Sequence, residues 1–172
     1  MQEQPARDEF EDCSPYPLHQ VYFDPLEIFG DPRGWLAELW RADEISTLPG
    51  LPAGEVPQMA YLSFTEHEVV RGPHEHERQT DIFVFLSQFR VYLWDSRPLS
   101  PTRGKRYKFT TDAVSPTRLV VPPHVVHAYQ ALSLEGGTVL NFPTSLYRGI
   151  DRKGPVDEIR HEEDPDSPYV LW

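Results

Sequence analysis

The sequence predicts an all-β fold, a β-sandwich or jelly roll of about eight short strands, and three observations support it. Proline is about twice as frequent as usual, at 18 of 172 residues, and prolines at this density interrupt helices but suit strands joined by turns. No apolar pattern of helical period is longer than about ten residues. Runs of β-branched and aromatic residues bounded by Pro, Gly, Asp or Ser recur along the chain.

The predicted elements follow one another with turn residues between them. The expected strands are, in chain order, Trp35–Arg41, Gln58–Phe64, Asp81–Leu86, Phe89–Asp95, Lys105–Thr111, Thr117–Val121, Val125–Ser133 and Gly137–Phe142. The best helical candidate is the segment 42–48, which ends at Pro49-Gly50. The run 82–86 is apolar throughout, which indicates a strand buried on both faces. The run 89–94 alternates, so Phe89, Val91 and Leu93 share one face.

The length favours one domain with two arms. At roughly 150 residues per domain, 172 residues make one compact unit. We expect a single domain over residues 1–172, with an N-terminal arm at 1–20, a barrel at 21–148 and a C-terminal arm at 149–172. Both arms are polar and contain prolines, although the final segment 169–172 has the apolar residues needed to dock on the barrel.

Charge and composition exclude several partners. The formal net charge is −11, and no basic stripe exists that would neutralise nucleic-acid phosphates or a membrane surface. No apolar run approaches the ~18 residues of a membrane span. Met1 is followed by an acidic stretch, unlike a secretory signal. The single cysteine, Cys13, cannot form an internal disulfide and is read as an inert thiol, so we expect a cytoplasmic protein.

Histidines in two short segments point to chemistry. His74 and His76 lie two residues apart, so on a strand they share one face about 6.5–7 Å apart. Asp81 follows five residues later, and His127 lies in a second group with His124. This spacing resembles the metal signature of cupins, in which three imidazoles and a carboxylate hold an ion open to substrate. One interpretation is therefore a metal-dependent cupin that binds one divalent ion; the plainer one is that these histidines are ordinary barrel and surface residues.

A longer series of motifs resembles the dTDP-4-dehydrorhamnose 3,5-epimerase family. The stretch 29–38 resembles its Asp-x-Arg-Gly, three residues, Glu signature, and the segment 58–63 its Gln-x-Asn-x-Ser signature. Residues 69–74 match its Val-x-Arg-Gly-Leu-His block, and residues 121–129 resemble its Pro-x-Gly-x-x-His-Gly-Phe block. The closing series comprises Tyr147, Glu158, Asp164 and Trp172. The resemblance runs from about residue 20 to the end and implies a cupin-type double-stranded β-helix, a jelly-roll barrel.

The resemblance also implies a function and a site. It implies an isomerase of nucleotide-linked 4-keto-6-deoxy sugars that removes a proton next to the keto group and needs no cofactor. The implied catalytic residues are His74 as general base, His127 in the pocket and Tyr147. The implied substrate-binding residues are Arg33, Glu38, Gln58, Arg71, His76, Asn141 and Glu158. In the family the element carrying the counterpart of Arg33 is often lent by the partner chain, so a homodimer is expected.

Two positions depart from the family pattern. The family's tyrosine general acid falls at Asn141, and its enolate-stabilising lysine falls at Asp81. Tyr147 and Tyr129 are candidates for the missing acid, and His76 is an additional imidazole. Three functions stay open: the epimerase or the similar dTDP-sugar 3,4-ketoisomerase, in which a histidine pair moves the proton; a metal enzyme using His74, His76, Asp81 and His127; and a non-catalytic sugar-nucleotide binding relative.

Overall fold

The computed structural model describes residues 18–112 and 114–172, and this part of the chain is built almost entirely from β-strands. The strands are β1 (Tyr22–Pro25), β2 (Ile28–Asp31), β3 (Gly34–Ala37), β4 (Tyr61–Thr65), β5 (Val70–Glu75), β6 (Asp81–Phe85), β7 (Phe89–Asp95), β8 (Arg106–Thr110), β9 (Thr117–Val121), β10 (Val125–Ala131), β11 (Gly137–Asn141) and β12 (Ile159–Arg160). Two short 3-10 helices, η1 (Ile45–Thr47) and η2 (His161–Glu163), complete this part. Cys13 and most of the expected N-terminal arm lie outside the described residues.

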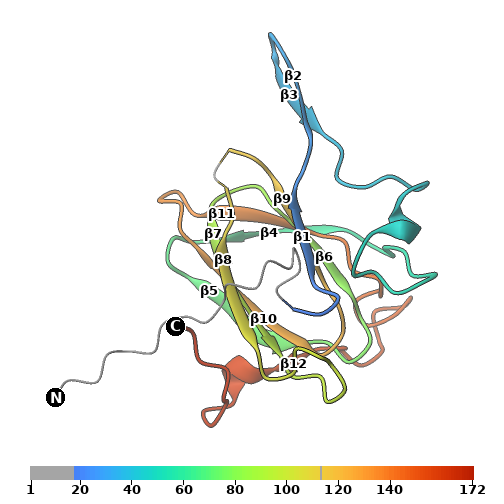
Figure 1. Ribbon diagram of the computed structural model, residues 1–172, viewed down its shortest axis with the longest axis vertical. Coiled ribbons are helices and arrows are strands. Elements are labelled where there is room, and N and C mark those ends of the chain that lie inside the picture. The colour runs from blue at the N-terminus through green and yellow to red at the C-terminus, as the bar shows by residue number, and fades with distance from the viewer. Residues whose placement is uncertain (1–17, 113) are drawn as a thin grey trace, which may run out of the picture.

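Two antiparallel sheets form the barrel, and the predicted all-β jelly roll is confirmed (Figure 1). One sheet has the strand order β1-β9-β6-β11-β4, and the other has the order β12-β5-β10-β7-β8. Except for β7 and β8, neighbours in each sheet are not consecutive in sequence, as in a jelly roll. The hairpin β2–β3 forms a separate small sheet that projects from the barrel (Figure 1).

The two best-defined predicted strands lie in the core for different reasons. Every residue of β6 is buried because the strand lies between β9 and β11 in the middle of its sheet. In β7 the alternating residues 89, 91 and 93 point into the main core, as predicted. The opposite face of β7 is also buried, because Trp94 packs against Trp172, with their ring centroids 5.3 Å apart. The C-terminal segment therefore docks on the outer face of this sheet.

Other elements differ from their predicted bounds. The predicted strand 35–41 reduces to the hairpin strand β3, and the predicted helix 42–48 is a single 3-10 turn, η1. Strands β1, β2, β5 and β12 are absent from the expected strands. Three of them, β1, β2 and β12, are two to four residues long and have too few residues for a periodic pattern, whereas the six residues of β5 include Gly and Pro, which are uncommon in strands. The C-terminal segment contributes β12, whose residues 159 and 160 pair with residues 75 and 74 of β5. Within the described residues no helix is long and apolar enough to cross a membrane.

Candidate functional site

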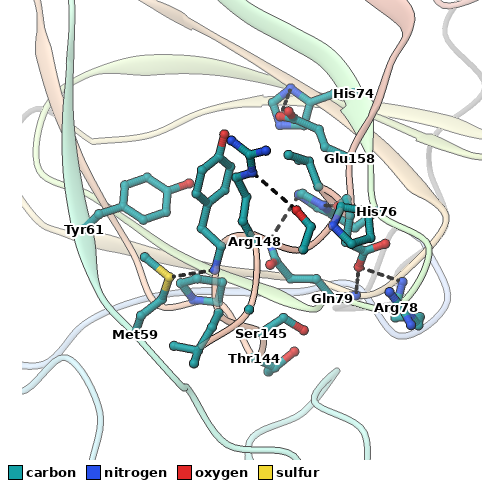
Figure 2. A pocket seen from close by; sticks show the side chains of 18 of the residues that line it. Met59, Tyr61, His74, His76, Arg78, Gln79, Thr144, Ser145, Arg148 and Glu158 are labelled. Atoms are coloured by element: carbon teal, nitrogen blue, oxygen red, sulfur yellow. Dashed lines mark hydrogen bonds and ion pairs between the residues drawn. The ribbon is translucent and has the colours of Figure 1, made fainter. Parts of the chain in front are cut away.

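A cavity of about 1430 Å³ opens between the barrel and the C-terminal segment (Figure 2). Strands β4 and β5 line it together with residues of the segment 143–162. Five of the residues around it are arginines: Arg71, Arg78, Arg148, Arg152 and Arg160. A cavity of this size with several guanidinium groups suits a large anionic small molecule.

Three histidines from two strands converge beside the cavity. His74 on β5 pairs in register with His127 on the neighbouring strand β10, and His76 follows directly after β5. The ring centroid of His127 lies 4.4 Å from that of His74 and 5.9 Å from that of His76. One ring nitrogen from each histidine lies within 4.8 Å of the others. The cluster that the sequence pattern indicates is therefore present, with His74 and His76 lining the cavity.

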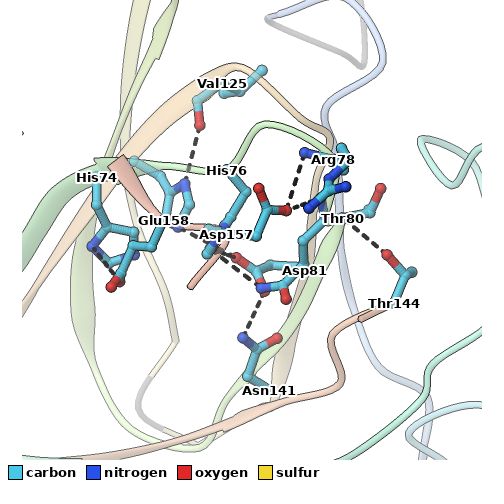
Figure 3. Close-up of polar contacts among 12 residues, drawn as sticks. His74, His76, Arg78, Thr80, Asp81, Val125, Asn141, Thr144, Asp157 and Glu158 are labelled. Carbon is cyan, nitrogen blue, oxygen red and sulfur yellow. Dashed lines mark hydrogen bonds and ion pairs between the residues drawn. The ribbon is translucent and has the colours of Figure 1, made fainter. Parts of the chain in front are cut away.

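Asp81 links these histidines to strands β6 and β11 of the other sheet (Figure 3). It is the first residue of β6 and is 1% exposed. One carboxylate oxygen lies 3.0 Å from Nε2 of His76 and 3.6 Å from Nε2 of His127. The other oxygen accepts hydrogen bonds from Nδ2 of Asn141 at 2.8 Å and from Nε2 of Gln79 at 2.9 Å. The buried carboxylate thus forms a hub of polar contacts.

Burial and neighbouring charge give the three imidazoles different protonation states. Burial, reinforced by the neighbouring His127 and His76, lowers the pKa of His74 to about 2. Burial also lowers the pKa of His127. For His76 burial acts in the same direction, but the hydrogen bond and charge of Asp81 outweigh it and raise the pKa. The hydrogen bond and charge of His76 likewise overcome burial and lower the pKa of Asp81. At neutral pH, His76 is an imidazolium paired with Asp81, while His74 and His127 are neutral.

The C-terminal segment holds His76 in this orientation. The backbone carbonyl of Asp157 accepts a hydrogen bond from Nδ1 of His76, which directs Nε2 toward Asp81. The carboxylate of Asp157 accepts hydrogen bonds from the backbone N–H groups of residues 77, 78 and 79, at 3.1, 3.1 and 2.9 Å. The turn after β5 is therefore attached to the C-terminal segment by four hydrogen bonds.

The same segment brings two carboxylates to His74. Nδ1 of His74 lies 3.9 Å from a carboxylate oxygen of Glu158 and 3.9 Å from one of Glu162. Glu158 was expected at the site, and it lines the cavity. Glu162 is not among the expected site residues, but it also lines the cavity. The pairing of β12 with β5 brings it there, and nothing in the local sequence indicates that pairing.

The other expected site residues, Tyr147 among the catalytic ones and the rest among the substrate-binding ones, fall into three places. Arg71, Gln58 and Tyr147 line the cavity with the residues already described. Asn141 is buried and does not line the cavity, but its side chain donates a hydrogen bond to the hydroxyl of Tyr61, which does. Arg33 and Glu38 lie in and beside the projecting hairpin, where they form ion pairs with nearby residues of the same segment. Within one chain they do not line the cavity.

Tyr61 is a further cavity residue, and no sequence motif indicates it. It is the first residue of β4, and its hydroxyl accepts a hydrogen bond of 2.9 Å from Nδ2 of Asn141. Burial and the nearby charge of Asp81 raise the pKa of Tyr61 to about 12. Its sequence signal is weak, since it is one aromatic residue within the predicted strand 58–64.

His124 stands where the family motif that the sequence resembles has glycine. It adopts a φ of 59°, in the left-handed region that favours glycine. Its side chain is half-exposed and lies 3.7 Å from Glu75, away from the cluster at 74, 76 and 127. The second histidine group therefore contributes only His127 to the site.

The arrangement offers two kinds of chemistry. A neutral imidazole at a cavity wall can accept a proton, and an imidazolium beside it can stabilise negative charge. His74, His76 and His127, with the Asp81 carboxylate beside them, also form a donor set that transition metals bind.

Comparison with known proteins finds a matching family and a relative in sequence. The family model described as dTDP-4-dehydrorhamnose 3,5-epimerase matches residues 15–153. The chain is 32% identical over 161 residues to a probable low-salt glycan biosynthesis epimerase of Haloferax volcanii. The aligned region covers 90% of this chain and 94% of the relative.

Solved structures share the fold at lower identity. NovW, a 4-keto-6-deoxy sugar epimerase of Streptomyces spheroides, superposes with a TM-score of 0.71 at 24% identity, over 88% of this chain and 76% of that one. The Legionella pneumophila 3,5-epimerase in complex with dTDP-4-keto-L-rhamnose gives a TM-score of 0.69 at 21% identity, over 88% and 80% of the two chains. These likenesses establish the barrel architecture.

Proposed function

We propose, from the premise that this chain belongs to the dTDP-4-dehydrorhamnose 3,5-epimerase family, that it isomerises a nucleotide-linked 4-keto-6-deoxy sugar. The reaction begins with removal of a proton from the carbon next to the keto group. The observation that carries this proposal is a neutral imidazole, His74, in the wall of an arginine-rich cavity of sugar-nucleotide size.

His74 is the proposed base. Its lowered pKa leaves a free electron pair at neutral pH, so it can take a proton without first losing one. The imidazolium that forms is stabilised by Glu158 and Glu162, whose carboxylate oxygens lie 3.9 Å from Nδ1. The keto group already acidifies the neighbouring carbon, so the remaining need is a positive group for the enolate oxygen. His76, charged and facing the cavity, meets that need in place of the family's lysine.

The arginines are the proposed diphosphate site. A guanidinium group grips phosphate oxygens with two parallel hydrogen bonds, and this geometry suits a nucleoside diphosphate. Arg71 is already held in place, because its Nε donates to Thr65 at 2.8 Å and its terminal nitrogen donates to the carbonyl of Phe64 at 2.7 Å. Gln58, which also lines the cavity, is the proposed contact to the nucleotide.

One exchange experiment tests the enzyme assignment. Purified protein in heavy water is incubated with dTDP-4-keto-L-rhamnose, and the sugar protons are followed by nuclear magnetic resonance. We expect deuterium to enter next to the keto group, and His74→Asn to slow this by about 10²–10⁴-fold. His19→Asn, an exposed histidine away from the cavity, is the matched control. Binding of the sugar nucleotide without exchange in the wild type would instead support a non-catalytic relative.

We further propose that the reaction needs no cofactor, since base, acid and enolate stabiliser are all side chains. A metal enzyme is the second candidate, favoured by the convergence of the three imidazole nitrogens within 4.8 Å. Elemental analysis of protein purified without chelators separates the two. The cofactor-free reaction predicts exchange that survives chelation. The metal reaction predicts one Fe, Mn, Ni or Zn per chain, lost in His76→Ala.

A homodimer is the proposed assembly. The hairpin β2–β3 exposes Trp35 (57%) and Leu36 (59%), and the edge strand β4 exposes Leu62 (67%). Exposed apolar side chains beside an unpaired strand edge favour association with a second copy. In such a dimer the Arg33 turn at the hairpin tip would reach the partner's cavity, as the family resemblance implies.

Light scattering tests the assembly. Leu62→Glu is expected to give monomers, whereas Leu99→Glu, at a leucine that is 99% exposed in a loop, should leave a dimer intact. A monomeric wild type contradicts the proposal. The cytoplasmic location stays a prediction, because it was based on Cys13 and on the start of the chain, which lie outside the described residues.

A further inference from the structure

We infer that Tyr61 is the general acid that returns a proton to the sugar, in place of the tyrosine that the family has at the position of Asn141. The inference rests on the proposed function and assigns one residue within it. It accounts for how a chain with asparagine at the acid position can still complete the reaction.

The hydrogen bonds around Asn141 determine where the Tyr61 proton points. The Asp81 carboxylate can only accept, so the Asn141 group 2.8 Å from it is the amide NH₂. The same nitrogen lies 2.9 Å from the Tyr61 hydroxyl, whose oxygen must therefore accept. The hydroxyl hydrogen of Tyr61 is thus left to donate elsewhere. Tyr61 lines the cavity whereas Asn141 is 1% exposed and does not, so the phenol presents its proton to the substrate space.

Tyr61 and the proposed base come from different sheets. Tyr61 begins β4, the edge strand of the sheet that contains β6 and β11, while His74 lies on β5 in the other sheet. Figure 2 shows the two side chains on different sides of the cavity view, with the Tyr61 hydroxyl directed inward. Inversion of a carbon centre requires the proton to leave from one face and return to the other. A base and an acid on opposing sheets meet that requirement.

The proton balance of the step is complete without another reagent. The C–H bond breaks, its proton passes to the His74 imidazole, and its electron pair enters the enolate. The enolate carbon then forms a new C–H bond with the Tyr61 proton on the opposite face and restores the keto group. The Tyr61 phenolate takes a proton from water, and the His74 imidazolium releases one to water.

The electrostatic surroundings fit an acid that stays protonated until it is used. Burial, with the charges of Asp81 and Glu158 adding to it, raises the pKa of Tyr61 to about 12, so the phenol keeps its proton at neutral pH. The hydrogen bond from Asn141 acts in the opposite direction and stabilises the phenolate when the proton leaves. Asn141 is therefore a positioning residue for Tyr61.

The two other tyrosines considered for this role have weaker positions. Tyr129 is 6% exposed, packs against Phe83 and Phe85 in the core and does not line the cavity. Tyr147 also lines the cavity, in the segment after β11, and is 56% exposed, against 45% for Tyr61. Only Tyr61 among the three contacts the residue at the family's acid position.

The test separates proton removal from proton return. In heavy water with dTDP-4-keto-L-rhamnose, wild-type protein should both exchange the proton next to the keto group and form the epimer. Tyr61→Phe should keep exchange, because His74 can return a solvent deuteron to the face it came from. Epimer formation should fall by about 10²-fold or more. Tyr107→Phe, which removes a hydroxyl from a tyrosine stacked on Phe23 away from the cavity, is the matched control.

Each result decides between the alternatives. Tyr61→Phe that forms epimer at the wild-type rate overturns the assignment, as does Tyr147→Phe that alone keeps exchange and loses inversion. Loss of exchange and inversion together in a folded Tyr61→Phe also overturns it, because proton removal does not use the acid. Wild-type protein that shows no exchange overturns the proposed function itself, and the two failures are therefore distinguishable.

Discussion

The floor of the cavity and its C-terminal wall hold the same histidines by different means. The floor consists of Asp81, His127 and Asn141, which are buried on three central strands and joined by side-chain contacts. The wall consists of residues 157–162, which are attached through the two-residue strand β12 and the turn contacts of Asp157. The floor sets which imidazole is charged, whereas the wall sets how His74 and His76 are oriented and what surrounds them.

This difference separates chemistry from substrate selection. A charge state set by a carboxylate that is 1% exposed is insulated from changes at the surface. The wall also supplies the side chains of Arg160 and Glu158 to the cavity, while the backbone carbonyl of Asp157 keeps His76 directed toward Asp81. We expect substitutions in the floor to abolish function and stability together, and substitutions in the wall to alter binding first.

The strongest test of this comparison is Asp81→Asn in the floor. The change leaves His76 without its ionic partner, so the pKa of His76 should fall and the buried pair should be lost. We expect the free energy of unfolding to drop by about 3–5 kcal/mol, measured by denaturant titration. Asp31→Asn, which removes a carboxylate from the exposed pair with Arg33, is the control and should leave stability unchanged. Equal stability of the two variants would contradict the central role of the floor.

The pH dependence of stability tests the assigned charge states. His74 and His127 have lowered pKa values, so below the ordinary value of 6.5 the unfolded chain binds two protons that the folded chain does not. Stability should therefore fall with acid, by about 1.4 kcal/mol per pH unit for each such proton. His76 has a raised pKa, so its contribution is complete below 6.5 and is lost as pH rises through about 9.

These opposite trends predict a stability maximum near the ordinary histidine value of 6.5 for this cluster. His74→Asn removes one of the two protons and should halve the acid slope of the free energy of unfolding. A variant at exposed His19, which lies outside the cavity, should leave the slope as it is. An acid slope that is the same in His74→Asn would show that His74 is not buried in its neutral form.

The smallest expected effect comes from the attachment of the wall. Nε2 of His161 lies 2.9 Å from the buried carboxylate of Glu75, on the side of β5 away from His74. His161→Ala should cost about 0.5–1.5 kcal/mol of stability and speed amide hydrogen exchange in β12. We expect KM to rise with little change in kcat, because the floor stays intact. A fall in kcat with KM unchanged would place His161 in the chemistry instead.

The sequence predicted much of the barrel but less of the site. The apolar run 82–86 indicated its central position, because burial on both faces excludes polar residues from every position of a strand. The histidine spacing likewise predicted convergence, because alternate residues of a strand share a face. Tyr61 and Glu162 could not be predicted, since each reaches the cavity through a strand pairing that no local pattern encodes.

The sequence by itself determined the all-β fold, the motif order of the family and the residue types available for catalysis, because these depend on local periodicity and composition. Only the tertiary structure decided which imidazole is charged and which tyrosine faces the substrate space. Both depend on distances between side chains from strands far apart in the chain, such as the 3.0 Å between His76 and Asp81 and the 2.9 Å between Tyr61 and Asn141. Electrostatic and hydrogen-bond energies vary steeply over such distances, and sequence spacing does not specify them.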